Sequence, residues 1–130
     1  MTANKTLGII ADDLTGAMDS SGYLANQGFT TNIIIDPDFY STADILAINT
    51  DSRVDDINTA NEKVRRAVRT LTGRIIYKKI DSTLRGNIGA ELQAAMEELA
   101  CEKAVVAPAF PSIGRTTVNG VLQVDGTRVG

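Results

Sequence analysis

The sequence contains no histidine and a single cysteine, and both shortages limit the chemistry that it can support. Without an imidazole, any acid–base step must use a carboxylate, a lysine or a tyrosine. Cys101 has no second thiol for an internal disulfide, which is typical of proteins of the reducing cytoplasm. No partner for catalysis or metal binding flanks Cys101. We therefore interpret it as a packing residue and expect a cytoplasmic protein.

Long apolar runs and an excess of basic charge are also missing. The longest apolar stretches have the length of β-strands, so the sequence predicts neither a membrane span nor a signal segment. The formal net charge of -3 gives no overall basic field that would attract nucleic acid or an anionic membrane. No set of carboxylates, thiols or imidazoles has metal-ligand spacing, so we expect no bound metal. A local site for a small anion remains compatible with this composition.

Short β-branched runs alternate with stretches of helical period along the 130 residues, a length that suits one domain. This alternation predicts a Rossmann-like, three-layer α/β domain with a mainly parallel sheet. At the C-terminal end, Asn119-Gly120 suits a type I′ turn and predicts a β-hairpin between 116–118 and 121–124. The predicted strands lie at 7–11, 31–35, 45–48, 74–80 and 104–107, and the predicted helices at about 15–27, 57–71 and 88–99.

Turn and capping residues mark several of these boundaries. Asp55 or Asp56 is a suitable N-cap for the second helix. Gly28 and Gly73 follow the first and second helices, where a C-terminal stop is wanted. The segment 36–38 (Asp-Pro-Asp) closes the second strand.

The loops that follow the predicted strands contain the most distinctive residues of the chain. In a parallel α/β sheet such loops emerge at the carboxyl edge, where ligands of these folds bind. We therefore expect four segments that are distant in sequence to meet at one edge of the sheet: 12–16, 49–53, 81–86 and 108–115.

Two adjacent carboxylates, Asp12 and Asp13, end the first apolar strand next to Thr15-Gly16. One of them could accept hydrogen bonds from a sugar hydroxyl or take its proton. The alternative is helix capping and turn formation, because aspartate and threonine are favoured at such positions. A doubled aspartate exceeds what capping requires, which favours a function.

A dense mixture of charged and hydroxyl side chains lies at 78–87. The forked guanidinium of Arg85 and the N–H groups of a helix start form a natural receptor for carboxylate or phosphate. Gly86 allows the backbone to approach closely. Combined with Asp81, these donors favour a polyol acid, which presents an anion and several hydroxyls; a solvated turn with surface charges is the alternative. The segment lacks the glycines of a Walker A loop, so the sequence shows no nucleotide site.

Two further loops contain arginines. Arg53 could hold a substrate carboxylate in bidentate fashion, and the alternative is a surface arginine paired with Asp51 or Asp55. In 108–115, two prolines around an aromatic residue indicate a stiff structural loop, although Arg115 could supply a further cation.

With these motifs in view, the chain resembles the four-carbon acid sugar kinase family, once known only as a domain of unknown function. The resemblance covers essentially the whole chain in order. Departures such as Met18-Asp19-Ser20-Ser21 bear on substrate preference. The resemblance rests on ADDLTGA at 11–17, TDSR at 50–53, KKIDSTLRGNIGAEL at 78–92 and APAFPSIGRTTVNGV at 107–121.

The family phosphorylates acids such as threonate, erythronate and oxo-tetronates at the terminal hydroxyl with ATP, using longer, two-domain chains. The resemblance implies that 1–130 form the N-terminal, acceptor-binding domain, inactive by itself. The C-terminal domain, absent from this chain, would bind ATP with Mg²⁺. The ending at Gly130 would then belong to a fragment, and we expect it to pair with a second copy through its former interface.

The resemblance also implies roles for individual residues. Arg53 and Arg85 would bind the carboxylate or the charge of the transferred group, and Asp12 would orient or deprotonate the attacking hydroxyl. The second function that we consider is a non-catalytic, small-anion-binding or effector-type protein. The expected substrate contacts are Asp12, Asp13, Arg53, Lys79, Asp81, Ser82, Thr83, Arg85 and Gly86.

Overall fold

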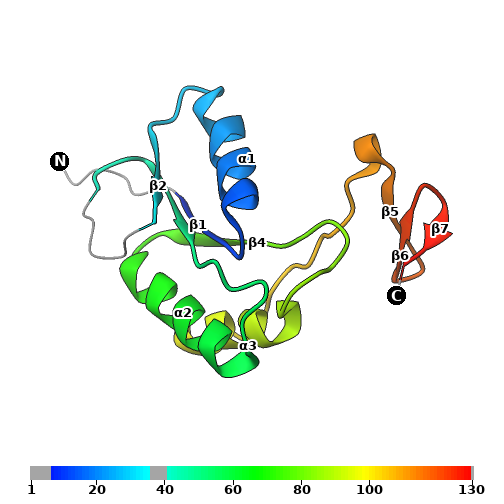
Figure 1. Ribbon diagram of the computed structural model, residues 1–130. Coiled ribbons are helices and arrows are strands. Elements are labelled where there is room, and N and C mark those ends of the chain that lie inside the picture. The colour runs from blue at the N-terminus through cyan, green and yellow to red at the C-terminus, as the bar shows by residue number, and fades with distance from the viewer. Residues whose placement is uncertain (1–6, 36–40, 130) are drawn as a thin grey trace.

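The computed structural model describes residues 7–35 and 41–129 of the chain (Figure 1). Its first part alternates strands and helices in the predicted order, and a short 3₁₀ helix precedes a C-terminal sheet. These elements are β1 (Leu7–Ala11), α1 (Leu14–Ala25), β2 (Thr31–Ile34), β3 (Ile45–Asn49), α2 (Ile57–Thr70), β4 (Ile75–Lys79), α3 (Ile88–Glu98) and η1 (Pro111–Ile113).

A parallel sheet in the order β2-β3-β1-β4 forms the centre of the molecule. Figure 1 shows α1 on one face of this sheet and α2 with α3 on the other, which confirms the three-layer α/β prediction. Ala11 at the end of β1 lies opposite both Asn49 of β3 and Lys79 of β4. The loops that follow these three strands therefore begin at the same level of the carboxyl edge.

The two central strands are buried on both faces, which explains why β1 and β3 are continuous apolar runs. Successive residues of a strand point to opposite faces of the sheet. Ile10 accordingly packs in the core shared with α2 and α3, whereas Ile9 packs in the smaller core beside Leu24 of α1. Gly8 leaves room for Leu71, because a Cβ at Gly8 would lie 2.9 Å from a methyl carbon of that side chain.

Capping residues set the ends of the helices largely as predicted. Asp13 caps α1, and Asp56 rather than Asp55 caps α2, each by accepting backbone hydrogen bonds in the first turn. Gly28 and Gly73 have φ angles of 93° and 81°, the left-handed conformation of a helix stop. The predicted end of the second strand at 36–38 lies outside the described residues.

The predicted strand at 104–107 is wrong. Within the described part of the chain this segment has no strand partner, and Val105 is 97% exposed. After α3 the chain passes beside β4 without pairing to it, and a cavity of about 360 Å³ lies between them. A β-branched run forms a strand where its side chains can pack on a half-buried surface, and the described chain offers no such surface at this position. β4 is consequently the edge of the described sheet, with Ile75 74% exposed.

A three-stranded antiparallel sheet, formed by β5 (Arg115–Val118), β6 (Val121–Val124) and β7 (Thr127–Arg128), ends the chain. The predicted hairpin is confirmed, since Asn119-Gly120 has φ angles of 49° and 78°, as a type I′ turn requires. A second turn at Asp125-Gly126 repeats these angles and adds β7, which was not predicted. Figure 1 shows this sheet standing apart from the four-stranded one.

Candidate functional site

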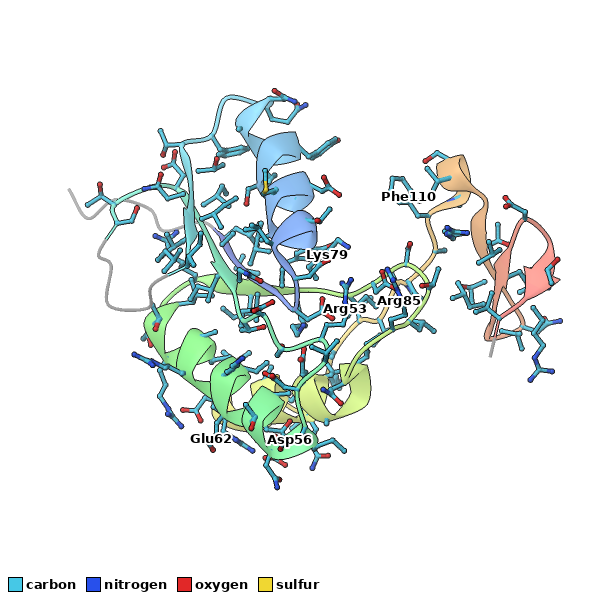
Figure 2. The ribbon with its side chains drawn as sticks, viewed as in Figure 1. Arg53, Asp56, Glu62, Lys79, Arg85 and Phe110 are labelled. Carbon is cyan, nitrogen blue, oxygen red and sulfur yellow. The ribbon has the colours of Figure 1, made fainter. Side chains whose placement is uncertain are left out.

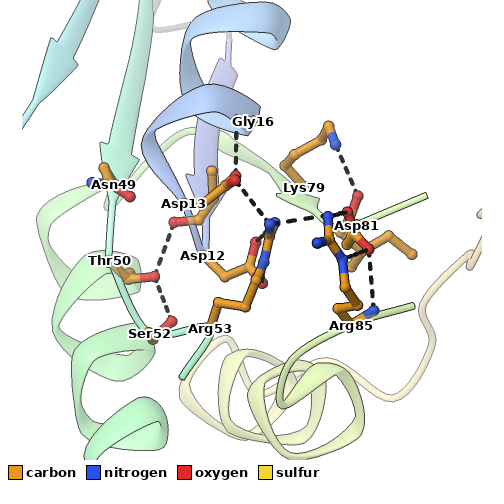
Figure 3. A network of polar contacts seen from close by, with 12 residues as sticks. Asp12, Asp13, Gly16, Asn49, Thr50, Ser52, Arg53, Lys79, Asp81 and Arg85 are labelled. Carbon is orange, nitrogen blue, oxygen red and sulfur yellow. Dashed lines mark hydrogen bonds and ion pairs between the residues drawn. The ribbon is translucent and has the colours of Figure 1, made fainter. Parts of the chain in front are cut away.

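Three strand-end loops meet at the carboxyl edge of the parallel sheet (Figures 2 and 3). They are 12–16 after β1, 49–53 after β3 and 81–86 after β4, so three of the four predicted loops come together. From the fourth, 108–115, Phe110 shares a cavity with Lys79 on the α1 side of β4. The prediction that this fourth loop joins the edge is therefore met only at Phe110.

Arg53 and Asp12 form the centre of the cluster. The Nε and Nη2 atoms of Arg53 donate to the two carboxylate oxygens of Asp12 over 3.0 and 2.9 Å, a bidentate geometry. Asp12 is only 2% exposed. These hydrogen bonds hold the pKa of Arg53 above its usual range, because they stabilise the charged guanidinium. The alternative pairing of Arg53 with Asp51 or Asp55 is wrong.

Asp13 both caps α1 and forms an ion pair with Arg53. Its Oδ1 accepts the N–H of Gly16 over 2.9 Å at the start of α1, and its Oδ2 lies 2.9 Å from Nη1 of Arg53. Helix capping therefore accounts for one oxygen of Asp13 and for neither oxygen of Asp12. Asp12 and Asp13 therefore both contact the guanidinium of Arg53.

A second ion pair, between Asp81 and Arg85, lies beside the first. Arg85 donates to both carboxylate oxygens of Asp81 over 2.8 and 3.0 Å, and the Thr83 hydroxyl adds a bond of 2.5 Å. The pKa of Asp81 lies well below its usual range, mainly because the hydrogen bonds from Arg85 stabilise the charged carboxylate. Burial acts in the opposite sense, and the Thr83 hydroxyl lowers the pKa further. Only 4.0 Å separates Asp81 from Nη1 of Arg53, so the two pairs adjoin.

Two cations of the cluster remain accessible to a ligand. The side chain of Arg85 is 66% exposed, although it is paired with Asp81. Lys79 donates to the carbonyl oxygen of Ile80 over 2.8 Å, and no carboxylate of the described chain pairs with it. Lys79 also lies against the start of α1, since a Cβ at Gly16 would be 3.3 Å from its Cγ.

Gly86 is required by close packing. Its φ angle is 95°, and a Cβ there would lie 2.9 Å from Oδ2 of Asp12 and 3.3 Å from Cγ of Arg53. The predicted close backbone approach is thus directed at the central ion pair. Ser82, in contrast, makes no side-chain hydrogen bond to any residue that the structure describes.

Beneath the ion pairs lies a buried polar chain that the sequence did not predict. The Ser52 hydroxyl donates to Oε1 of Glu91 over 2.6 Å, and Lys78 lies 2.7 Å from Oε2 of the same carboxylate. Thr50 continues the chain, with 2.8 Å to the Ser52 hydroxyl and 2.9 Å to the carbonyl oxygen of Ala11. Lys78 near the end of β4 was the available signal, but its partner on α3 was not foreseen.

Within 7–35 and 41–129, no group of three or more histidine, cysteine, aspartate or glutamate residues could hold a metal ion. In the same ranges, no helix has both the length and the apolar content to cross a membrane.

Residues 7–130 match the model of a sugar-binding N-terminal domain. The chain belongs to this family. Two relatives of this sugar-binding domain are D-threonate kinase of Salmonella typhimurium, 42% identical over 91% of this chain, and 3-oxo-tetronate kinase of Haemophilus influenzae, 37% identical over 91%. D-erythronate kinase of Heliobacterium modesticaldum is 42% identical over 89% of the chain. The chain spans 29%, 31% and 28% of the lengths of these three relatives.

Solved structures share the fold of the sugar-binding domain. A domain of unknown function from Bordetella bronchiseptica, a domain-swapped dimer with bound citrate, is 39% identical with a TM-score of 0.82. The match covers 95% of this chain and 33% of the Bordetella chain. A Haemophilus influenzae protein is 34% identical with a TM-score of 0.83, over 93% of this chain and 32% of its own. The resemblance to the four-carbon acid sugar kinase family is thereby confirmed.

Proposed function

We propose that this chain is the acceptor-binding part of an ATP-dependent kinase that phosphorylates the terminal hydroxyl of a four-carbon sugar acid. The supporting observation is the cluster at the carboxyl edge, where Arg53, Lys79 and Arg85 alternate with Asp12, Asp13 and Asp81. A sugar acid carries one anionic group and several hydroxyls, and this cluster offers cations and hydrogen-bond acceptors within one small area.

In this proposal the exposed Arg85 and the half-buried Lys79 bind the carboxylate. Arg85 can turn one face of its guanidinium toward the ligand while Asp81 holds the other, and Lys79 adds a point charge from the start of α1. Arg53 is the more deeply placed cation, with a side chain 20% exposed. It would stabilise charge on the substrate or on the transferred group. Ser82 and Thr83 would contact the acid from the loop after β4.

Asp12 and Asp13 would serve the reacting hydroxyl. Both oxygens of Asp12 accept hydrogen bonds from Arg53, which favours orientation of the hydroxyl over strong proton abstraction by Asp12. Phosphoryl transfer needs chiefly positioning and charge stabilisation. The new bond would join the terminal oxygen to the γ-phosphorus of ATP, the bond from that phosphorus to ADP would break, and the hydroxyl proton would pass to Asp13 or to solvent water.

The phosphoryl donor would come from elsewhere in the protein. Neither a Walker A segment nor a set of metal ligands is found in the described part of this chain. We therefore assign ATP with Mg²⁺ to a C-terminal nucleotide-binding domain of a longer chain, with 1–130 as the N-terminal domain. The single cysteine supports a cytoplasmic location.

Two properties of the Bordetella relative support further parts of the proposal. Its structure contains citrate, a hydroxylated carboxylic acid, which agrees with a site for an anion that carries a hydroxyl. It is also a domain-swapped dimer. We propose a homodimer for this chain too, formed where Ile75 of β4 and Val105 of the segment after α3 leave apolar side chains exposed.

The direct test is a set of four-carbon acids, including threonates, erythronates, a 3-oxo-tetronate and 4-hydroxythreonate, measured by calorimetry with the full-length protein. At least one acid should bind and be phosphorylated by ATP at its terminal hydroxyl, as phosphorus NMR would report. Arg85→Ala should weaken binding about 10–100-fold, because the proposed charge-assisted contact between the guanidinium and the acid's carboxylate is lost.

The matched control is Arg69→Ala. Arg69 is also an exposed arginine that donates to both oxygens of one carboxylate, Glu98, but it lies on α2 away from the cluster. This variant should bind the acids as the wild type does. Failure of every acid to bind would contradict the proposed substrate class, and binding without transfer would favour the non-catalytic, anion-binding alternative.

A further inference from the structure

Glu91 forms a buried ion pair directly beneath the proposed site. Its side chain is 1% exposed, it lies in the first turn of α3, and Lys78 reaches it from β4. Two buried charges lose their hydration, and the attraction between them returns this loss only in part. A well-packed apolar pair would hold a helix to a sheet at least as well. Stability alone therefore gives little reason for an ion pair at this position.

The ion pair is connected to the central residues of the site through Ser52. The Ser52 hydroxyl donates to Glu91 over 2.6 Å. The backbone N–H groups of Ser52 and Arg53 both donate to the carbonyl oxygen of Asp12, over 3.0 and 3.3 Å. A rotation of the Ser52 side chain and peptide would therefore move the backbone that carries Arg53 and would loosen its contact with Asp12.

Thr50 and Asn87 restrain the same peptide from other directions. Thr50 joins the Ser52 hydroxyl to the carbonyl oxygen of Ala11. The Asn87 amide donates to the carbonyl oxygen of Ser52 over 3.3 Å and to that of Asp55 over 2.9 Å. Glu91 is the charged group of this set, and Lys78 fixes its orientation. Networks of this kind hold functional side chains in place when every member has a partner.

We propose that Glu91, oriented by Lys78, is a positioning residue that sets Arg53 on Asp12 through the Ser52 hydroxyl. It does not touch the acceptor. Its loss would displace Arg53 and Asp12, and a displacement of about 1 Å in a catalytic site can cost on the order of 100-fold in rate. The inference rests on the proposed function only for its kinetic readout.

The test compares two double variants that both remove the buried charges. Glu91→Leu with Lys78→Met replaces the pair with apolar side chains of similar volume and removes the hydrogen bond to Ser52. Glu91→Gln with Lys78→Met also removes the charges but keeps an amide that can bond to the Ser52 hydroxyl. Both should fold, and their melting temperatures should lie within a few degrees of each other.

For kinase activity of the full-length protein, the leucine variant should lower kcat/KM about 10–100-fold, mainly through kcat. The glutamine variant should recover most of this loss. Amide hydrogen exchange at Ser52 and Arg53 should be faster in the leucine variant and close to wild type in the glutamine variant, with no acid present. A purely structural ion pair would not separate the two variants in either measurement.

Ser52→Ala provides an independent variant should the leucine protein fail to fold. It removes one buried hydroxyl and leaves Glu91 and Lys78 in place, so it should reproduce the loss of kcat/KM and the faster exchange of the Arg53 amide. The control is Arg69→Met with Glu98→Leu, which removes a pair between α2 and α3 at the surface.

The outcomes separate the inference from the proposed function. If the wild type binds none of the acids, the proposed substrate class fails, and the exchange rates still decide the role of Glu91. If Ser52→Ala and the leucine variant both match the wild type in exchange and in kcat/KM, the positioning role of Glu91 is overturned.

Discussion

Arg53 donates two hydrogen bonds to Asp12, a residue 41 positions earlier in the chain. The pair joins the loop after β1 to the loop after β3, and Gly86 packs against it from the loop after β4. All three loops therefore depend on one contact between two side chains. The first two predictions follow from the geometry of that contact.

Arg53→Lys should weaken acid binding by about tenfold or more while the protein remains folded. A lysine keeps the positive charge, but it presents a point charge and cannot donate to both oxygens of Asp12 in parallel. Calorimetric titration with the preferred acid measures the effect, and Arg69→Lys on α2 is the control. Equal affinities for Arg53→Lys and the wild type would contradict this prediction, because they would show that the positive charge alone is sufficient for acid binding.

Gly86→Ala should lower both stability and acid affinity, whereas Gly73→Ala should lower stability alone. Both glycines have positive φ angles, 95° and 81°, but the space around Gly73 is open. The φ angle costs about 1–2 kcal/mol for alanine at either position. At Gly86 the new methyl also meets Asp12, which cannot move without breaking its bonds to Arg53. Urea denaturation and calorimetric titration of both variants measure the difference.

The pH dependence of stability should change in Asp81→Asn. In the folded protein the pKa of Asp81 lies below its ordinary value of 3.8, so the folded state resists protonation that the unfolded state accepts. The contribution of Asp81 is fully present above about pH 5 and is lost as the pH falls below 4 toward its folded pKa. The wild type should thus lose more stability than Asp81→Asn between pH 5 and pH 2.

Urea midpoints measured across this pH range check the sign of the effect. Asp56→Asn is a useful comparison, because hydrogen bonds from the Thr59 hydroxyl and from backbone N–H groups at the start of α2 lower the pKa of Asp56 without any contact to Asp81. A steeper loss of stability in Asp81→Asn than in the wild type would contradict the assignment.

The proposed homodimer predicts that charge on the exposed apolar surface beside β4 will prevent association. Val105→Glu with Ile75→Lys should shift the protein toward monomer in sedimentation experiments at an unchanged melting temperature, because both side chains are largely exposed. Val54→Glu is the control, since Val54 is 94% exposed in the loop after β3. A monomeric wild type at high concentration would exclude the homodimer.

Local patterns in the sequence predicted most of the fold. The strands β1 and β3, the helix α2 and the turn at Asn119-Gly120 each depend on residues close in sequence, and each was correctly assigned. The strand expected at 104–107 failed because pairing depends on a neighbour that composition does not specify. β7 was not predicted, although Asp125-Gly126 is a sequence typical of a type I′ turn.

The position of the site could be predicted from the sequence, but the pairing of its charged side chains could not. The carboxyl-edge rule brought 12–16, 49–53 and 81–86 together, because parallel strands place their following loops at one edge. The partner of Arg53 was sought among its nearest carboxylates in sequence, whereas it lies in the loop after the neighbouring strand β1. Glu91 was not predicted either, because it lies 39 positions from Ser52 and within a regular helical pattern.

The strands β1, β3 and β4 end at the same level of the sheet, and this alignment also determines which insertions the protein can tolerate. An extra residue inside one of these strands would advance its following loop by about 3.3 Å and turn every later side chain of the strand to the opposite face. The same residue placed after Gly28, between α1 and β2, would leave all three loops where they are. Changes in length that preserve this family's chemistry should therefore gather at the opposite, amino edge of the sheet.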